Sequence, residues 1–89
     1  MTSYSFREAE EFNRVLPTIF DWEGETLKPP DIAIRLVRQT NRGNYRSEKL
    51  QGASDYVEHI LKMGILLIET PPGSRRYTYP VKLESTKKK

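Results

Sequence analysis

The stretch Val57-Glu58-His59-Ile60-Leu61-Lys62-Met63-Gly64-Ile65-Leu66-Leu67-Ile68 changes its hydrophobic period at Gly64 and thereby decides the fold. Up to Gly64, apolar residues recur three or four positions apart, which places them on one face of a helix. They are Leu50, Ala53, Val57, Ile60 and Leu61. Gly64 can turn left-handed without a Cβ penalty and is expected to end this helix. A short apolar run follows, so the sequence predicts a helix that leads directly into a β-strand.

The strand after Gly64 is expected to be the first half of a β-hairpin. It should cover Ile65 to Thr70 and end at the turn-forming sequence Pro71-Pro72-Gly73-Ser74. From Arg75 onward the side chains alternate between two faces. One face would carry Tyr77, Tyr79, Val81 and Leu83, and the other Arg76, Thr78 and Lys82. Because Pro80 has no N–H to give a ladder, we expect this second strand at an edge of the sheet.

Toward the N-terminus, the helix that ends at Gly64 should begin near Arg46 or Ser47. Gly52 lies in its middle, where glycine costs about 1 kcal/mol relative to alanine. The helix could break there, with Ser54 capping a second piece. Since the apolar face continues across Gly52, we expect one helix. The face Leu50, Val57, Ile60 and Leu61 should then be buried.

Two further helices are predicted before this one. Ser5 and Glu8 have the spacing of a capping box, and a broad apolar arc follows them to about Leu16. The second helix should open at Pro29-Pro30-Asp31, since proline suits a first turn and aspartate suits the positive helix end. Residues 41–44 should end it. The single tryptophan, Trp22, lies in the connector, and we expect it to cover the core.

Composition indicates one small domain. The chain has 89 residues, 30% of them charged, and no cysteine, which excludes disulfides and thiolate metal sites and fits a reducing compartment. No run resembles a membrane span or a signal peptide. We expect a domain over 1–84, a basic disordered tail over 85–89, and a cytoplasmic or nucleoid-associated protein. Net charge is +3, with basic residues concentrated after residue 64, which suggests a polyanionic partner.

Three helices followed by a hairpin resemble a winged helix-turn-helix domain, and the resemblance covers most of the chain. Leu27 to Leu36 is similar to the start of that family's second helix, where a Pro-acid-Ile-Ala pattern is common. Ile60 to Ile68 resembles the end of its recognition helix and its first wing strand, and Pro71 to Arg76 would form the wing tip. Thr40 to Arg46 departs from the family because it is longer than the usual tight turn. The resemblance implies an α+β fold that binds DNA.

Two groups of residues are candidates for contact with double-stranded DNA. Basic and aromatic side chains at a wing can straddle phosphates or enter a minor groove, and basic residues at a helix start can face the major groove. The wing group is Arg75, Arg76, Tyr77 and Lys82, and the helix-start group is Arg42, Asn44, Tyr45, Arg46, Ser47 and Lys49. Alternatively, the wing charges only protect a sheet edge, and the helix-start group is an ordinary charged surface.

We therefore expect a small DNA-binding transcriptional regulator, with a possible homodimer through the first helix. The alternative is a protein–protein adaptor, which Asp55 and Glu58 on the outward face of the third helix favour because carboxylates repel phosphate. His59 is the only histidine and should lie on the surface, so no metal site is expected. No catalytic motif occurs, and neither an enzyme nor a cofactor is expected.

Overall fold

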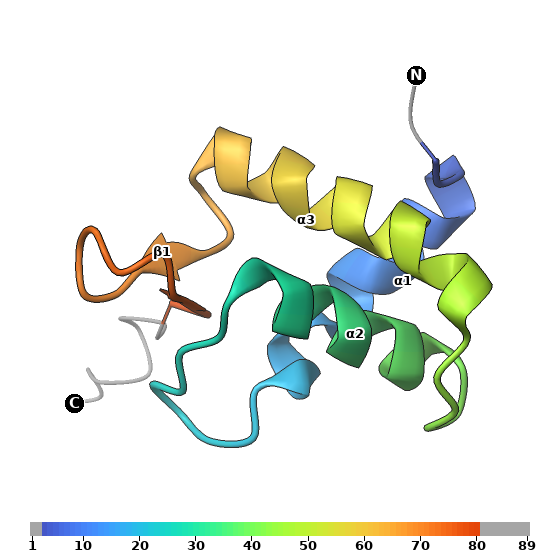
Figure 1. Ribbon diagram of the computed structural model, residues 1–89, viewed down its shortest axis with the longest axis horizontal. Coiled ribbons are helices and arrows are strands. Elements are labelled where there is room, and N and C mark those ends of the chain that lie inside the picture. Colours follow the sequence, from blue (N-terminus) through green and yellow to red (C-terminus); the bar gives the residue numbers. More distant parts are fainter. Residues whose placement is uncertain (1–2, 81–89) are drawn as a thin grey trace, which may run out of the picture.

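The computed structural model describes residues 3–80, which form three helices and a two-stranded antiparallel hairpin (Figure 1). The elements are α1 (Phe6–Val15), the 3-10 helix η1 (Leu16–Ile19), α2 (Pro29–Thr40), the 3-10 helix η2 (Ser47–Lys49), α3 (Leu50–Met63), β1 (Ile68–Glu69) and β2 (Tyr77–Thr78). The predicted α+β class is confirmed, and the arrangement is compatible with a winged helix. Val81, Lys82, Leu83 and the tail 85–89 lie outside the described residues. Within the described part, no helix has the length and apolar character needed to cross a membrane.

The α-helix expected to begin near Arg46 or Ser47 begins at Leu50, after the 3-10 turn η2. Local signals place three other helix ends as predicted. The Glu8 N–H donates to Ser5 Oγ at 3.1 Å and the Ser5 N–H donates to Glu8 Oε1 at 2.9 Å, which completes the capping box of α1. Two prolines open α2, where their missing N–H groups leave no helical bond unmade. Gly64 has φ +67° and its N–H donates to the Ile60 carbonyl at 3.1 Å, so α3 ends in a left-handed cap.

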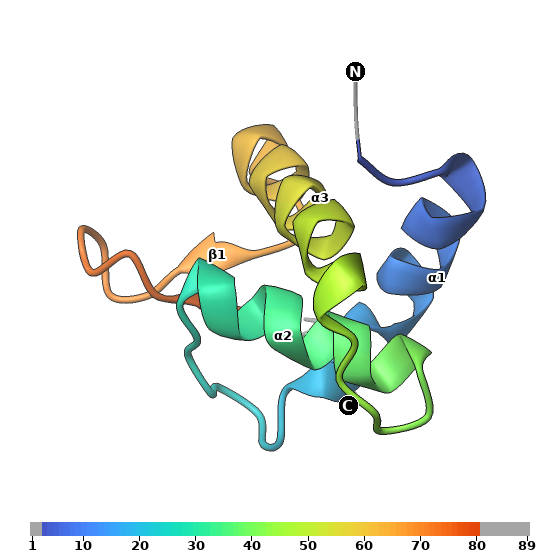
Figure 2. The ribbon, with the colours of Figure 1, turned by 45° about the vertical axis from the view of Figure 1, so that its right-hand side comes forward.

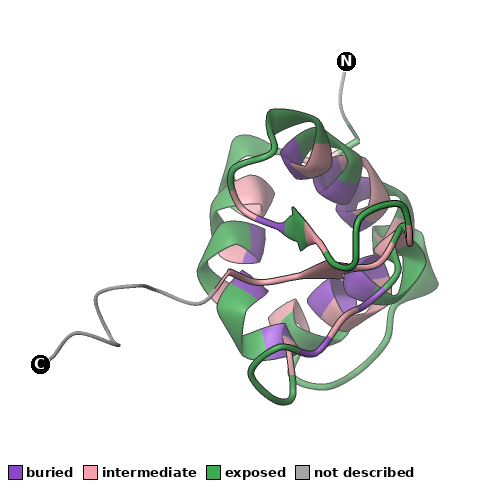
Figure 3. Ribbon diagram, turned by 90° about the vertical axis from the view of Figure 1, so that its left-hand side faces the viewer, coloured by how far each residue is buried: buried purple, intermediate pink, exposed green. Residues whose placement is uncertain are grey.

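The three helices pack around one apolar core (Figure 2), and the buried residues lie on the sides of the helices that face the interior (Figure 3). The core residues are Phe12, Leu16, Ile19, Leu27, Ile32, Ala33, Leu36, Val37, Ala53, Tyr56, Val57, Ile60 and Leu67. Burial raises the pKa of Tyr56 to about 12, and its ring lies 5.2 Å from that of Phe12. The core is therefore built mainly from α2 and the inner face of α3.

Three side chains expected in the core are less buried than predicted. Leu50 and Leu61 are only half-buried, because the face of α3 that meets α2 is centred on Ala53, Val57 and Ile60. Trp22 is 62% exposed, so the expectation that it covers the core is wrong. The loop before α2 turns the indole outward, and Ile19 and Leu27 at its two ends fill the core instead.

The hairpin is shorter and better enclosed than the sequence predicts. β1 covers only Ile68–Glu69, since the chain bends just after Gly64, and it pairs with β2 in the register Glu69 to Tyr77. On its other side Tyr77 exchanges two backbone hydrogen bonds of 2.8 Å with Leu27. β2 is an edge strand of the two-stranded sheet, as predicted, but a single bridge from Leu27 covers its outer side at Tyr77. Pro80 is compatible with this because it follows the paired residues.

α3 runs unbroken through Gly52, as predicted, but the glycine has a second role. A Cβ built at Gly52 would lie 3.0 Å from the Ser3 carbonyl oxygen and 3.4 Å from Tyr4 Cβ. The segment before α1 is held there by a hydrogen bond from Ser3 Oγ to Asp55 and by an edge-on contact between the rings of Tyr4 and Tyr56. Gly52 therefore admits this segment against α3.

The close contact reverses the simple expectation for Gly52→Ala. We expect the alanine to lower the free energy of unfolding of the full chain, because the N-terminal segment must shift. In a chain lacking residues 1–4, the same substitution should stabilise by up to about 1 kcal/mol, the propensity difference between the two residues. Urea denaturation of the four proteins tests this. Equal stabilisation in both backgrounds would show that the segment does not pack on Gly52.

Candidate nucleic-acid interface

The segment before α3 presents the predicted helix-start group as one continuous surface. Every residue from 42 to 49 is exposed, including six of the predicted DNA-contacting residues. α2 ends at Thr40, and the turn after it contains two left-handed residues, Arg42 with φ +56° and Gly43 with φ +87°. The Gly43 N–H donates to the Arg38 carbonyl at 2.8 Å, which fixes the turn to the end of α2. The basic side chains here are thus carried on an anchored loop.

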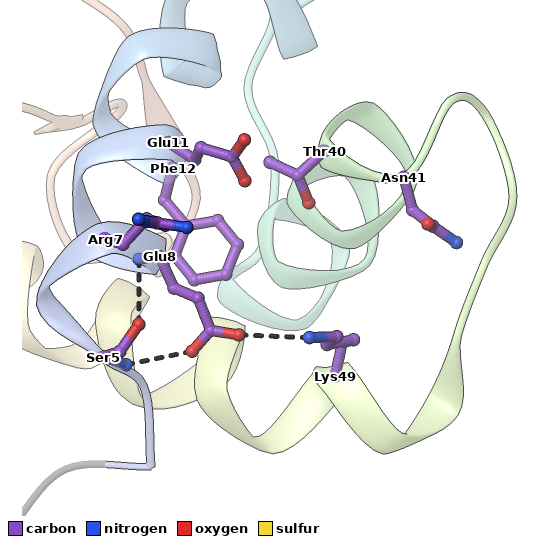
Figure 4. A pocket seen from close by; sticks show the side chains of 8 residues that line it. All are labelled: Ser5, Arg7, Glu8, Glu11, Phe12, Thr40, Asn41 and Lys49. Atoms are coloured by element: carbon purple, nitrogen blue, oxygen red, sulfur yellow. Dashed lines mark hydrogen bonds and ion pairs between the residues drawn. The ribbon is translucent and has the colours of Figure 1, made fainter.

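Two of these basic side chains form ion pairs with carboxylates. Arg46 Nη2 lies 2.6 Å from Glu48 Oε2, and Lys49 Nζ lies 3.2 Å from Glu8 Oε2 (Figure 4). The bond from the Ser5 N–H and the nearby Lys49 ammonium lower the pKa of Glu8 below its ordinary value. Within residues 3–80, Arg42 has no carboxylate at ion-pair distance. Arg42 can therefore contact a phosphate without first breaking an ion pair.

The hairpin places only one of its two arginines in the open. Arg75 is exposed, with φ +62°, and its N–H donates to Glu69 Oε2 at 2.7 Å. Arg76 is only half-buried rather than fully exposed, and its Nε donates to Thr26 Oγ1 at 3.3 Å. Tyr77 is half-buried and pairs with Leu27. Lys82, the fourth predicted wing residue, lies outside the described residues.

The two predicted groups form separate clusters at opposite ends of α3 (Figure 1). The segment of residues 42–49 leads into α3 and the hairpin follows its last turn. With 14 residues, α3 is about 21 Å long at 1.5 Å per residue. The molecule measures 44 Å along its longest axis. A ligand that contacts both clusters must therefore be extended.

Between the clusters, the outward face of α3 is mixed in charge. Gln51, Glu58, His59 and Lys62 are exposed, so the predicted surface position of His59 is confirmed. Asp55 is half-buried and accepts hydrogen bonds from Ser3 Oγ and, at 3.0 Å, from Gln51 Nε2. The described chain contains no group of three or more side chains that could hold a metal ion.

A groove beside the wing was not foreseen from the sequence. We call it the wing groove; it has a volume of about 490 Å³ and is lined by Lys28, Pro29, Pro30, Ser74, Arg75 and Tyr77. The pairing of Leu27 with Tyr77 brings its two walls together. Two of its six lining residues are basic and none is acidic. Nothing in the local sequence joins residues 28–30 to residues 74–77.

A partly buried ion pair between Glu25, in the loop between η1 and α2, and Arg35 of α2 was also missed. The Glu25 side chain is buried, and its Oε1 lies 2.9 Å from Arg35 Nη1. The same oxygen accepts the Asp21 N–H at 2.8 Å, and Arg35 also donates to the Ile19 carbonyl at 3.0 Å. Burial by itself raises the pKa of Glu25, but the bonds from Arg35 and from the Asp21 N–H together hold it below its ordinary value.

The lowered pKa of Glu25 predicts how the stability of the protein changes in acid. A carboxyl that is more acidic in the folded chain adds stability above its unfolded pKa of about 4.3, and this stability is lost as pH falls through the folded pKa. We expect the thermal midpoint of the wild type to decrease as the pH drops below that value. The midpoint of Glu25→Gln should decrease less steeply. Thermal denaturation between neutral pH and about pH 2.5 measures both. Glu10→Gln, at an exposed position of α1, is the matched control. A Glu25→Gln profile parallel to the wild type would contradict the assignment.

Comparison with protein-family models, with curated proteins and with solved structures found no match to this chain. The likeness to winged helices therefore rests on the sequence patterns and on the order and pairing of the elements.

Proposed function

We propose that the protein binds double-stranded DNA as a small winged-helix transcriptional regulator. One observation carries the proposal: exposed basic side chains flank α3 at both ends, with Arg42 before it and Arg75 after it. The 14 residues of α3 that lie between the two clusters span about 21 Å, more than the roughly 12 Å width of a B-DNA major groove. Contacts at the two ends can thus reach phosphates on either side of a groove that α3 faces.

The middle of α3 would then face the bases. Gln51 can pair with adenine, and Glu58 can accept from cytosine N4. Carboxylates repel phosphate, so the affinity would come from the basic side chains that flank α3. The helix itself would contribute to sequence preference. Arg46 and Lys49 could exchange their carboxylate partners for phosphates, because exposed ion pairs contribute little free energy.

Chemical-shift mapping with a short duplex tests this proposal. We expect amide resonances of residues 42–49 and 74–77 to move together on titration, with smaller changes in α1. Shifts confined to one cluster would contradict the two-ended contact. Absence of shifts at low salt would contradict DNA binding altogether.

The second candidate is a protein–protein adaptor. The exposed apolar residues Met63, Ile65 and Ile68 lie close together in sequence where α3 gives way to β1, beside the mixed-charge face of α3. Such patches are typical of protein contacts. If the protein fails to bind DNA, this surface becomes the better candidate for its function.

A further inference from the structure

Trp22 is exposed on a loop that is held in one shape. We call residues 21–24 the Trp22 turn. The Glu25 N–H donates to the Trp22 carbonyl at 3.1 Å, and Glu25 is itself held by Arg35 and by the Asp21 N–H. An aromatic side chain on a fixed loop loses little conformational entropy on binding, and tryptophan is among the commonest anchors of protein interfaces. The turn is therefore suited to insertion into a pocket.

The wing groove is complementary to this turn in chemistry and in charge. Pro29, Pro30 and Tyr77 offer apolar surface for an indole, and a cation beside the ring adds attraction. The Trp22 turn carries two exposed carboxylates, Asp21 and Glu23, while the groove carries the ammonium of Lys28 and the guanidinium of Arg75. Opposite charges around an apolar contact fix its orientation and disfavour other pairings.

The loop of residues 20–27 and the hairpin lie on the same side of the molecule, on the left in Figure 1 and facing the viewer in Figure 3. Trp22 does not fill the groove of its own chain, since its side chain is exposed. A two-fold rotation can place each Trp22 turn at the groove of the other copy, and such an arrangement closes at two subunits. We propose that the protein forms a reciprocal homodimer in which Trp22 of each copy occupies the wing groove of the other.

This dimer uses a different surface from the one suggested by the sequence of α1. Phe12 and Leu16 of the apolar arc are buried, and Ala9 and Val15 pack partly against the core, which leaves Phe6 as its exposed member. The Trp22 turn and the wing groove are a better pair of surfaces, because both include apolar groups and the acidic turn is opposite in charge to the basic groove.

The interface should be weak and reversible. A tryptophan buries at most about 250 Å², so the two side chains supply at most about 500 Å², less than half of the roughly 1,200 Å² at the lower end of stable interfaces. The inference does not rest on DNA binding, although Arg75 belongs to both surfaces. Dimer formation would cover Arg75 and so would compete with a wing contact to DNA.

Sedimentation equilibrium from about 10 μM to about 1 mM protein, a range suited to weak interfaces, tests the proposal. We expect the wild-type mass to rise toward twice the monomer, with a parallel blue shift in the emission of Trp22, the only tryptophan of the chain. Trp22→Ala should remain monomeric. Ile65→Ser, at a residue 66% exposed, is the matched control and should dimerise like the wild type.

Charge reversal identifies the two surfaces. Glu23→Lys alone and Lys28→Glu alone should each remain monomeric, because like charges then meet at both contacts. An equimolar mixture should dimerise again, since each turn then meets a groove of opposite charge. Both positions are exposed, and unchanged thermal midpoints would show that the variants are folded.

Three results would overturn the proposal. One is a wild type that stays monomeric over the whole range, with emission typical of an exposed indole. Another is a Trp22→Ala variant that dimerises as well as the wild type, which would place the interface elsewhere. The third is a mixture of the reversed variants that stays monomeric although the wild type dimerises.

Discussion

Replacing Leu36 or Ile60 by alanine should lower the free energy of unfolding by about 2–5 kcal/mol. Leu36 on α2 has no exposed surface and Ile60 on α3 is 1% exposed, so each substitution leaves a cavity between the two helices that build the core. The total stability of a small domain is about 5–15 kcal/mol, and a chain of this size has little to spare. Either variant could therefore be largely unfolded at body temperature.

Leu61→Ala provides the matched comparison. Leu61 follows Ile60 directly but is only half-buried, so its truncation should cost clearly less than that of Ile60. Urea denaturation of the three variants and the wild type gives the differences. If Leu61→Ala destabilised as much as Ile60→Ala, the inner face of α3 would be different from the one described.

The second large effect concerns DNA binding. Arg42→Ala and Arg75→Ala should each weaken binding to duplex DNA and lower the log–log salt slope by about 0.9, the value for one lost phosphate contact. Arg42 belongs to the segment before α3 and Arg75 to the hairpin after it, so the double variant should lose about 1.8 in slope, the sum of the two. Phosphate contacts carry no sequence information, and the loss should be alike on specific and random duplexes.

Arg14→Ala is the control for this pair. It also removes one exposed positive charge, at the end of α1, and leaves both clusters intact. Its slope should equal that of the wild type. An equal loss for Arg14→Ala would mean that net charge alone determines binding. A wild-type slope for the Arg42→Ala, Arg75→Ala double variant would show that neither cluster touches DNA.

Much of the fold could be predicted because its signals are local. Ser5 with Glu8, the two prolines at the start of α2 and Gly64 each act on the chain within a few residues, and each was placed correctly. The turn before Arg75 is of the same kind. Short-range chemistry therefore gave the order of helices and hairpin.

Features that join distant residues could not be predicted. The pairing of Leu27 with Tyr77 links positions 50 residues apart and covers the outer side of the edge strand β2 at this residue. The wing groove and the contact of Ser3 with Gly52 have the same origin. Periodicity also places an apolar face without telling where its centre lies, which is why Leu61 was expected deeper than it is.

The candidate site was predictable in its exposure and unpredictable in its electrostatics. That residues 42–49 form an exposed segment follows from turn residues and charge. That Glu8 lies beside Lys49 depends on how α1 packs near the start of α3. The separation of loop and wing likewise depends on the direction in which the chain leaves α3.

The salt dependence of wild-type affinity for a random duplex tests the central claim most directly. Titrations at protein concentrations well below those of self-association give the observed binding constant at each salt concentration. The two clusters contain five basic residues that can contact phosphates, namely Arg42, Arg46, Lys49, Arg75 and Arg76. We predict a log–log slope between about −3 and −5, as expected for three to five or so contacts. A slope near zero, or no binding even at low salt, would contradict the proposal that this protein binds DNA.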